Sequence, residues 1–325
     1  MGMVIGIDIG GTKLTAALAG TDGSVERKIR RPTEESWTAR DNLAALRELI
    51  QQLLSAAKRR EADVLGIGVG FGGPVDPVRG VVRRSHHVEG WEGIALRHEF
   101  EGTFHIPTHV DNDANVGALG ELAYGAARNR QHVVYVNIGT GIGGALIISG
   151  KLHHGATGNS GEIGHTVIDR SGPPCTCGQR GCLEAFCSGP SIRRRAVARL
   201  CQARPESTSL PTGARAVSVT SEVVFEAAQN GDVVAGELVD ETAELLGIGI
   251  ANALNLVNPE LVVIGGGVSE AGDVLLAPLR EAIRMHALPG AANAEVVSAE
   301  LGYDAGVLGA VALAAQHIQY SNADA

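Results

Sequence analysis

Apolar runs that lead into glycine-rich turns occur twice in the same form along this chain. The run 4–9 ends at the turn Gly10-Gly11-Thr12-Lys13, and a second apolar run, 14–18, follows that turn. The run 133–138 is followed in the same way by a glycine-rich turn and the apolar run 145–148. Short apolar runs bounded by turn residues are typical of buried strands. The pattern therefore predicts two strand–turn–strand hairpins.

The rest of the chain alternates between strand-like and helix-like patterns. Apolar residues recur at helical spacing in several long segments, and shorter apolar runs lie between them. We predict helices over 38–60, 116–124, 190–203, 219–230, 233–255, 273–286 and 307–318, and strands over 25–29, 64–69, 261–268 and 296–298. This alternation predicts an α/β fold.

The residues in the two predicted hairpin turns suit a bound nucleotide. Glycine lets the backbone approach a phosphate group closely, while Thr12 offers a hydroxyl and Lys13 a positive charge. Asp8, at the end of the first strand, can hold Mg²⁺ through water. A plain turn would explain either hairpin alone, and neither matches a P-loop, which leads into a helix. Because the arrangement occurs twice, we predict two related α/β domains that face one nucleotide, with Gly265 and Gly266 near its adenosine.

A run of polar residues joins a predicted strand to the helix 116–124. Asp111, Asn112 and Asp113 all have side chains that accept hydrogen bonds at a helix N-terminus. A helix needs only one such cap, so a second role is open to the others, and a carboxylate here can act as a general base on a hydroxyl. Gly72 and Gly73, after the strand 64–69, form either a ligand-binding loop at the sheet edge or a plain turn.

Three cysteines and one histidine are close together in the segment 161–184. They are His165, Cys175, Cys177 and Cys182, the ligand types of a closed structural zinc site. Two carboxylates, Glu162 and Glu184, flank them. We predict that a zinc ion holds this loop and aims both carboxylates at a small polar substrate.

Composition narrows the class of protein. Of 325 residues 44 are glycine, hydrophobic residues make up 44%, and the formal net charge is −9. A chain of this size suits two domains, and its negative charge argues against a general nucleic-acid-binding role. No basic start with an apolar run resembles a signal peptide, and no segment reaches the ~20 apolar residues of a membrane span. We expect a cytoplasmic protein in which Cys187 and Cys201 are ordinary buried or half-buried thiols.

The set of motifs resembles the ROK family of sugar kinases and sugar-responsive repressors. The resemblance covers the whole chain and is closest to family members that act on glucose. It is carried by residues 8–13, 111–115, 139–144, 161–165 and by the pattern Cys175-x-Cys177-Gly178-x-x-Gly181-Cys182-x-Glu184.

Membership of this family implies a two-domain actin-like ATPase fold, which is ribonuclease H-like, with a zinc-binding loop at 161–184. The smaller N-terminal α/β domain would comprise residues 1–113, and the C-terminal helix 306–325 would pack back on it. The larger α/β domain would comprise 114–305. The two domains would enclose a cleft.

The resemblance also assigns roles to individual residues. Asp113 is the general base on the primary hydroxyl of a hexose, converting glucose to glucose 6-phosphate. The residues implied to bind the sugar are Gly73, Asn112, Asp113, Glu162, His165 and Glu184, and His165 also binds zinc with Cys175, Cys177 and Cys182. Those implied to bind ATP with its Mg²⁺ are Asp8, Gly10, Gly11, Thr12, Lys13, Gly139, Thr140, Gly141, Gly143, Gly265 and Gly266.

Three features depart from the family pattern. Asp111 stands where the family commonly has Glu, residues 157–160 are more polar than usual, and Gly73 follows Gly72 where Pro-Gly-Pro is more usual. The last two lie on the expected sugar side, so N-acetylmannosamine, N-acetylglucosamine, fructose and allose stay open as acceptors. Polyphosphate also stays open as a donor.

Two other classes of function are weighed against the kinase. A sugar-binding regulator of the same family would carry a DNA-binding helix-turn-helix before the first hairpin, and we expect none because the first strand begins near residue 4. A noncatalytic zinc-stapled sugar sensor would need neither Asp113 nor both phosphate hairpins. We expect a homodimer or homotetramer, with no nucleic-acid or membrane partner.

Overall fold

Two five-stranded sheets organise the chain in the computed structural model, which describes residues 2–85 and 88–323. Unit 1 comprises Met1–Asn129, Leu152–Ser160 and Glu300–Ala325, and unit 2 comprises Arg130–Lys151 and Gly161–Ala299. This division differs from the boundaries expected after residues 113 and 305. Helix α3 (Asp113–Tyr124) belongs to unit 1 because it packs against α9 (Ala305–Ala323), the C-terminal helix of the same unit.

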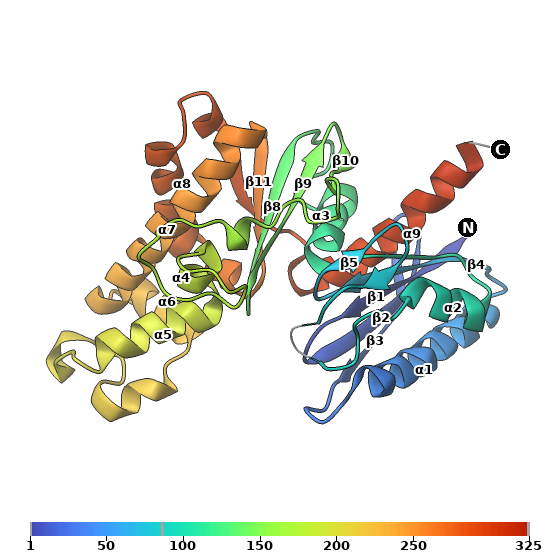
Figure 1. Cartoon of the computed structure of the whole chain (residues 1–325), viewed down its shortest axis with the longest axis horizontal. Coiled ribbons are helices and arrows are strands. Elements are labelled where there is room, and N and C mark those ends of the chain that lie inside the picture. The colour runs from blue at the N-terminus through green and yellow to red at the C-terminus, as the bar shows by residue number, and fades with distance from the viewer. Residues whose placement is uncertain (1, 86–87, 324–325) are drawn as a thin grey trace. The chain divides into compact units, whose positions relative to one another are not determined.

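The sheet of unit 1 has the strand order β3-β2-β1-β4-β7, and Figure 1 labels β1 to β4. Its strands are β1 (Met3–Ile9), β2 (Lys13–Gly20), β3 (Val25–Pro32), β4 (Val64–Phe71) and β7 (Thr108–Asn112). The pairs β1–β2 and β2–β3 are antiparallel, so the first predicted hairpin is confirmed. The pairs β1–β4 and β4–β7 are parallel, so the carboxyl ends of β1, β4 and β7 share one edge.

Three glycines of β4 lie on one face of this sheet. Gly66, Gly68 and Gly70 alternate along β4, so all three face the same side. A Cβ atom on Gly68 would lie 1.9 Å from the carbonyl oxygen of Ala310 in α9, and one on Gly70 would lie 3.2 Å from Val116 in α3. The glycines of this strand therefore allow α3 and α9 to pack close to the sheet. From the sequence we expected glycine in phosphate-binding turns and did not predict this second role.

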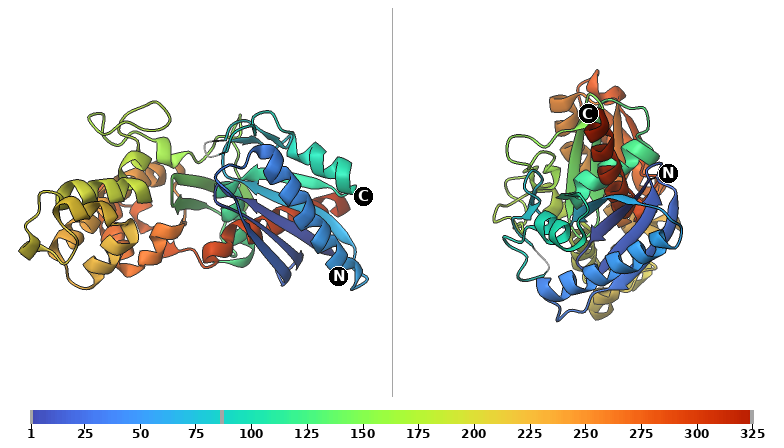
Figure 2. Two further views of the ribbon diagram at one scale, coloured as in Figure 1. Left: turned by 90° about the horizontal axis from the view of Figure 1, so that it is seen from below. Right: turned by 90° about the vertical axis from the view of Figure 1, so that its right-hand side faces the viewer.

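The opposite face of the sheet carries the larger core of unit 1. Helix α1 (Ala39–Lys58) lies along it, as Figure 2 shows, and Leu46, Ile50 and Leu53 are fully buried there. The helix begins after Thr38, whose backbone N–H donates to the Asp41 carboxylate at 2.9 Å. The helix predicted over 38–60 is confirmed to within two residues at each end.

The chain between β4 and β7 contains elements that the hydrophobic pattern did not predict. They are a two-stranded ribbon, β5 (Val75–Asp76) and β6 (Val81–Val82), and helix α2 (Leu96–Phe104). Trp91, which is 1% exposed, packs edge-on against Phe71 at a ring distance of 5.2 Å. This packing holds the segment against the carboxyl end of β4.

Unit 2 repeats the topology of unit 1. Its strands are β8 (Val133–Ile138), β9 (Ile142–Ile148), β10 (Lys151–Leu152), β11 (Leu261–Gly265) and β12 (Glu295–Ser298), in the order β10-β9-β8-β11-β12. β8 and β9 form the second predicted hairpin, and β8–β11 and β11–β12 are parallel. The two sheets thus share strand order, and in both of them an antiparallel hairpin adjoins parallel strands.

The helices of unit 2 pack around a core of their own. They are α4 (Leu183–Cys187), α5 (Gly189–Leu200), α6 (Ser221–Gln229), α7 (Val233–Val257) and α8 (Asp273–His286). Helices α7 and α8 pack against each other, with Leu246, Ile250 and Ile283 fully buried. α7 ends at Asn258, which has a left-handed backbone (φ 49°) that asparagine tolerates at this position.

The expectation that both remaining thiols of unit 2 are buried or half-buried was wrong for one of them. Cys201 is exposed, whereas Cys187 is buried as expected. Of the basic run in α5, Arg195 is not on a solvated face, because its guanidinium contacts the Phe186 carbonyl at 3.2 Å and the Glu241 carboxylate at 3.0 Å. Arg194 likewise donates to the carbonyl of Ala185 at 2.5 Å, so the two arginines join α5 to α4 and α7.

Candidate functional site

In unit 1 the predicted site residues meet at the shared carboxyl edge of β1, β4 and β7. Ile9 pairs with Phe71 and Phe71 with Asn112, so the segments that follow the three strands are neighbours. The Gly72 backbone N–H donates to the Ile9 carbonyl at 3.0 Å, and the Asn112 side-chain N–H donates to the Gly73 carbonyl at 3.2 Å. The structure therefore brings Gly73, Asn112 and the end of β1 together, at the edge where ligands of α/β sheets usually bind.

The side chains of Asn112 and Asp113 make different hydrogen bonds at the start of α3. Asn112 is the N-cap, and its side-chain oxygen accepts from the N–H groups of Ala114 at 2.9 Å and Asn115 at 3.4 Å. The expected cap is thus confirmed, and Asp113 does not have to supply it. Asp113 Oδ1 accepts from the Ala114 N–H at 2.9 Å, and Oδ2 is directed to Gly72, 3.8 Å from where a Cβ on that glycine would lie. A carboxylate at a helix N-terminus is also stabilised by the helix dipole.

The buried carboxylate of Asp111 holds this loop through hydrogen bonds. Its side chain is 2% exposed, and Oδ1 accepts from the Asn112 backbone N–H and from the Asn115 side chain, both at 2.8 Å. Its other oxygen, Oδ2, lies 2.6 Å from Nε2 of His154. Nothing in the spacing of the sequence indicated the contact with His154, because it joins residues far apart in the chain.

The first glycine hairpin presents the predicted phosphate-binding residues at the same edge. The turn is closed by a hydrogen bond from the Gly10 N–H to the Lys13 carbonyl at 3.1 Å, and Gly11 and Thr12 are exposed at its tip. Lys13 Nζ lies 5.5 Å from the centre of the Tyr303 ring. Burial raises the pKa of Asp8 to about 6, although Lys13 and Arg30 lower it. A charge held in this environment favours a cation beside it.

In unit 2 the second hairpin and the third glycine turn are neighbours. The Gly139 N–H donates to the Gly141 carbonyl at 2.9 Å, with Thr140 and Gly143 in the same hairpin. Gly265 pairs with Asn137 across β11 and β8, which places Gly265 and Gly266 beside the end of β8. Gly266 has φ 85°, and a Cβ there would lie 2.4 Å from the Ile138 carbonyl, so only glycine fits. The predicted nucleotide-binding residues of unit 2 are thus brought to one edge.

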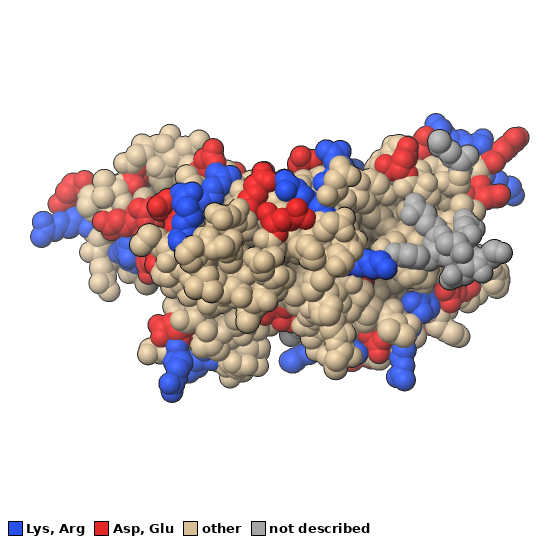
Figure 3. Space-filling model, turned by 90° about the horizontal axis from the view of Figure 1, so that it is seen from above, with Lys and Arg blue, Asp and Glu red and all other residues tan. Residues whose placement is uncertain are grey.

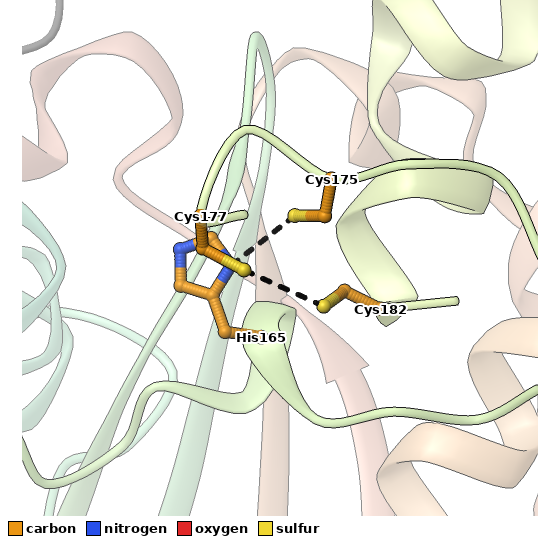
Figure 4. Close-up of side chains that lie close together, drawn as sticks. All are labelled: His165, Cys175, Cys177 and Cys182. Atoms are coloured by element: carbon orange, nitrogen blue, oxygen red, sulfur yellow. Dashed lines mark hydrogen bonds between the residues drawn. The ribbon is translucent and has the colours of Figure 1, made fainter. Parts of the chain in front are cut away.

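The four predicted metal ligands come together, as Figure 4 shows. His165 lies at the end of a short 3₁₀ helix (Ile163–His165), Cys175 and Cys177 lie on one turn, and Cys182 precedes α4. Their ligand atoms are all within 4.8 Å of one another, with 3.6 Å between Cys175 Sγ and His165 Nδ1 and 3.7 Å between Cys177 Sγ and Cys182 Sγ. A tetrahedral zinc with bonds of about 2.3 Å to sulfur and about 2.0 Å to nitrogen would set these distances near ~3.5 and ~3.8 Å. The two distances therefore agree with such an ion, and the four ligand types are those of a closed structural zinc site.

The two carboxylates beside the cluster are held differently. Glu184, in the first turn of α4, accepts from the Ile142 N–H at 2.9 Å and from the Thr176 hydroxyl at 3.2 Å. It therefore links the cysteine loop to the second glycine hairpin. Glu162 precedes His165 in the 3₁₀ turn, where the His165 N–H donates to the Glu162 carbonyl at 3.1 Å. Both carboxylates thus extend from the same loop as the four potential metal ligands.

On the face drawn in Figure 3, acidic and basic side chains are interspersed, and no continuous basic area is seen among the residues described there. Within residues 2–85 and 88–323, none of the helices is both long enough and apolar enough to cross a bilayer.

Comparisons with known proteins relate this geometry to one family. The profile of the ROK family matches residues 4–317. A glucokinase of Halalkalibacterium halodurans is 38% identical over 94% of this chain and 92% of its own, and a glucokinase of Thermotoga maritima is 34% identical over 97% and 98%. A crystal structure of a ROK family glucokinase from Streptomyces griseus, in complex with glucose and AMPPNP, is 32% identical and has a TM-score of 0.81 over 97% of this chain and 100% of that one.

Proposed function

Because this chain belongs to the ROK family, we propose that it is an ATP-dependent hexose kinase that phosphorylates the primary hydroxyl of glucose. The observation that carries the proposal is the placement of Asp113 at the start of α3, with Oδ2 directed to Gly72 at the carboxyl edge of the sheet. The relatives named glucokinase support glucose as the acceptor.

In this reaction Asp113 is the general base. Its carboxylate takes the proton of the sugar's primary hydroxyl while the hydroxyl oxygen attacks the γ-phosphorus of ATP. The bond from that phosphorus to the bridging oxygen breaks, ADP leaves, and glucose 6-phosphate forms. The hydrogen bond that Asn112 makes to the Gly73 carbonyl holds the two segments on either side of the base. A positioned base of this kind typically contributes a factor of about 10² to 10⁴ to the rate.

The sugar is recognised by groups that accept hydroxyl hydrogens. The residues that we infer to bind it are Gly73, Asn112, Asp113, Glu162, His165 and Glu184. Carboxylates suit a hexose because each accepts more than one hydroxyl, and an analogue that lacks a hydroxyl leaves a buried acceptor unpaired. Glu184 accepts from the Ile142 N–H, the Thr176 hydroxyl and, at 4.0 Å, the Cys175 thiol, and its two oxygens have about four acceptor positions, which leaves capacity for a sugar hydroxyl.

The glycine turns bind the nucleotide. In unit 1 the binding residues are Asp8, Gly10, Gly11, Thr12 and Lys13, and in unit 2 they are Gly139, Thr140, Gly141, Gly143, Gly265 and Gly266. Asp8 would hold Mg²⁺ through water, and the ion supplies charge neutralisation to the phosphates when it is bound. The raised pKa of Asp8 supports this role, because a buried carboxylate of that kind gains most from a nearby cation.

The cysteine cluster holds a structural zinc ion in this proposal. His165, Cys175, Cys177 and Cys182 use all four positions of a tetrahedral ion, so no position is left for a substrate. The distances between the ligand atoms support zinc. The ion's role is to hold the loop from which Glu162, His165 and Glu184 extend.

The Asp113→Asn variant tests the catalytic proposal. We expect kcat for glucose phosphorylation to fall by about 10² to 10⁴, while isothermal titration still detects glucose binding, because Asn keeps the shape and one hydrogen-bond acceptor. Asp63→Asn is the matched control, because Asp63 is an exposed carboxylate in the same unit. Turnover of Asp113→Asn close to that of Asp63→Asn would remove the general-base role.

A further inference from the structure

The segment Leu152–Ser160 is a short excursion of the chain into unit 1. The chain enters it from β10 and leaves it at Gly161, and both neighbouring stretches belong to unit 2. Within unit 1 the segment is held at three points. Leu152 packs against the cluster of Val116 and Leu119, His154 contacts Asp111, and Gly158 lies against Val75 and Pro77.

The contact between His154 and Asp111 occupies the remaining oxygen of a buried carboxylate. Asp111 Oδ1 already receives two hydrogen bonds, from the Asn112 N–H and the Asn115 side chain. His154 Nε2 lies 2.6 Å from Oδ2, and the segment folds around it, with the Ser160 N–H donating to the His154 carbonyl at 3.2 Å. A carboxylate buried to this degree is strongly destabilised if one oxygen loses its partner.

The carboxylate in turn determines the conformation of the loop that carries the proposed base. The Asp111 side chain holds the N–H of Asn112, which is the N-cap of α3 and the residue before Asp113. It also holds Asn115, in the first turn of the same helix. Rotation of the Asp111 carboxylate therefore changes the direction in which the Asp113 side chain leaves the helix.

We infer that His154 is a positioning residue for phosphoryl transfer, acting through Asp111 on the orientation of Asp113. The inference rests on the proposed function, because it names a residue that supports the general base of that reaction. The direction of the His154 pKa agrees with it. The hydrogen bond to Asp111 raises the pKa of His154 above its ordinary value of 6.5, so the ring keeps a proton to donate at higher pH.

The contribution of His154 is expected in kcat more than in sugar affinity. In-line attack requires the base to be aligned closely, and small displacements of a catalytic group cost up to about 100-fold in rate. Glucose affinity depends on several groups in both units, so losing the alignment of one affects it less. A role in folding alone would instead lower the amount of folded enzyme and leave the kcat of that folded enzyme unchanged.

The test compares His154→Ala with His153→Ala, since His153 is its exposed neighbour on the same segment. Active enzyme is counted by glucose titration, and kcat and KM are measured at one pH. We expect His154→Ala to lose about ten-fold to 100-fold in kcat with a smaller change in KM, and His153→Ala to match the parent. His154→Gln, which keeps an N–H donor for Asp111, should recover a large part of the lost rate.

A double-mutant comparison and hydrogen exchange separate this inference from the kinase proposal. In an Asp111→Asn background, His154→Ala should cost much less than in the parent, because the contact is already changed. Amides of residues 112–115 should exchange faster in His154→Ala than in His153→Ala. Equal kcat values for the two alanine variants, or equal exchange at 112–115, would overturn the positioning role. If the parent fails to phosphorylate glucose, the proposed function is wrong, and the exchange result alone then decides whether His154 holds this loop.

Discussion

We predict that replacing Asp8 with Asn raises the stability of the apoprotein and lowers its kinase activity. It lies in β1 and faces the start of α9, where a Cβ on Gly306 would lie 2.8 Å from the Asp8 carboxyl carbon. Burial raises its pKa from 3.8 to about 6. At neutral pH the folded protein therefore contains an ionised carboxylate that the unfolded chain accommodates more easily.

The magnitude follows from linkage between protonation and folding. Because the folded pKa is raised, the folded state binds more protons than the unfolded chain between pH 3.8 and about 6, so stability falls as pH rises through this range. Above pH 7 the cost is at most about 3 kcal/mol, and it falls below about 1 kcal/mol near pH 4. Asp8→Asn removes this cost and keeps the shape of the side chain.

Thermal melting of the apoprotein at two pH values measures the effect. At pH 7.5 we expect Asp8→Asn to melt up to about 10 °C higher than the parent, and the difference should shrink as pH falls from 6 to 4. The same variant should lose most of its turnover with Mg-ATP, because Asp8 is the proposed magnesium partner. Melting at or below the parent temperature at pH 7.5 would refute the reasoning about burial.

Asp22→Asn, in the turn between β2 and β3 of the same sheet, is the matched control. Hydrogen bonds from Ser24 lower the pKa of Asp22, so its ionised form favours the folded state and is lost only as pH falls below the ordinary range. Asp22→Asn should therefore lower the melting temperature slightly at pH 7.5, the opposite sign to Asp8→Asn, with turnover unchanged. Both variants replace Asp with Asn, yet their melting temperatures would change in opposite directions, because Asp8 is destabilised by burial and Asp22 is stabilised by hydrogen bonds from Ser24.

Three further predictions concern the metal, a buried carboxylate and a buried histidine. Cys177→Ser should lose about one zinc per chain by elemental analysis and weaken glucose binding, whereas Cys201→Ser, at an exposed thiol outside the cluster, should keep both; native protein without zinc would contradict the cluster's role. Glu121, which is 0% exposed, accepts hydrogen bonds from the N–H groups of Ala126, Glu300 and Leu301. In urea unfolding, Glu121→Gln should therefore lower the free energy of unfolding by about 2–3 kcal/mol, and an unchanged midpoint would contradict this role of the carboxylate. Burial and the stacked ring of His317 lower the pKa of His109 to about 4, so the contribution of neutral His109 to stability is lost as pH drops from 6.5 towards 4. The melting temperature of His109→Gln relative to the parent should therefore rise as pH drops across that window; a difference that does not change with pH would exclude this explanation.

Elements with a strong local pattern were predicted well. The hairpin strands β1, β2, β8 and β9 are apolar on both sides of a glycine turn, and α8 (Asp273–His286) matches its predicted bounds. The apolar pattern identifies these elements because each of them must bury apolar side chains in the core. A helix cap among Asp111, Asn112 and Asp113 was predicted from residue type, because capping is a local hydrogen bond. The structure identifies Asn112 as the cap and starts α3 at Asp113, three residues before the predicted start.

Features that depend on tertiary contacts were not predicted. β5 and β6 have two residues each, too few for a period to be detected, and α2 contains Gly102 and is short. Arg195 looks like any other member of a basic run, and only the fold brings the Phe186 carbonyl to it. His154 has no periodic or motif context, so its contact with Asp111 becomes evident only once the segment Leu152–Ser160 is placed in unit 1.

The candidate site shows the same contrast. The cysteine ligands were predicted from residue type and spacing, because a small metal loop needs ligands close in sequence, and the structure brings all four together. The link from Glu184 to the Ile142 N–H of the second hairpin was not predicted, because it joins segments far apart in the chain. The sequence motifs identify which residues matter, while their mutual support depends on the fold.

The most direct measurement is initial-rate ADP release across a sugar panel. Glucose, N-acetylmannosamine, N-acetylglucosamine, fructose and allose are compared at equal concentration with Mg-ATP, and the phosphorylated product is identified. We predict the highest kcat/KM with glucose, one glucose 6-phosphate formed per ADP, and loss of both in Asp113→Asn. ADP release that is independent of sugar, or sugar-dependent release that persists in Asp113→Asn, would contradict the account.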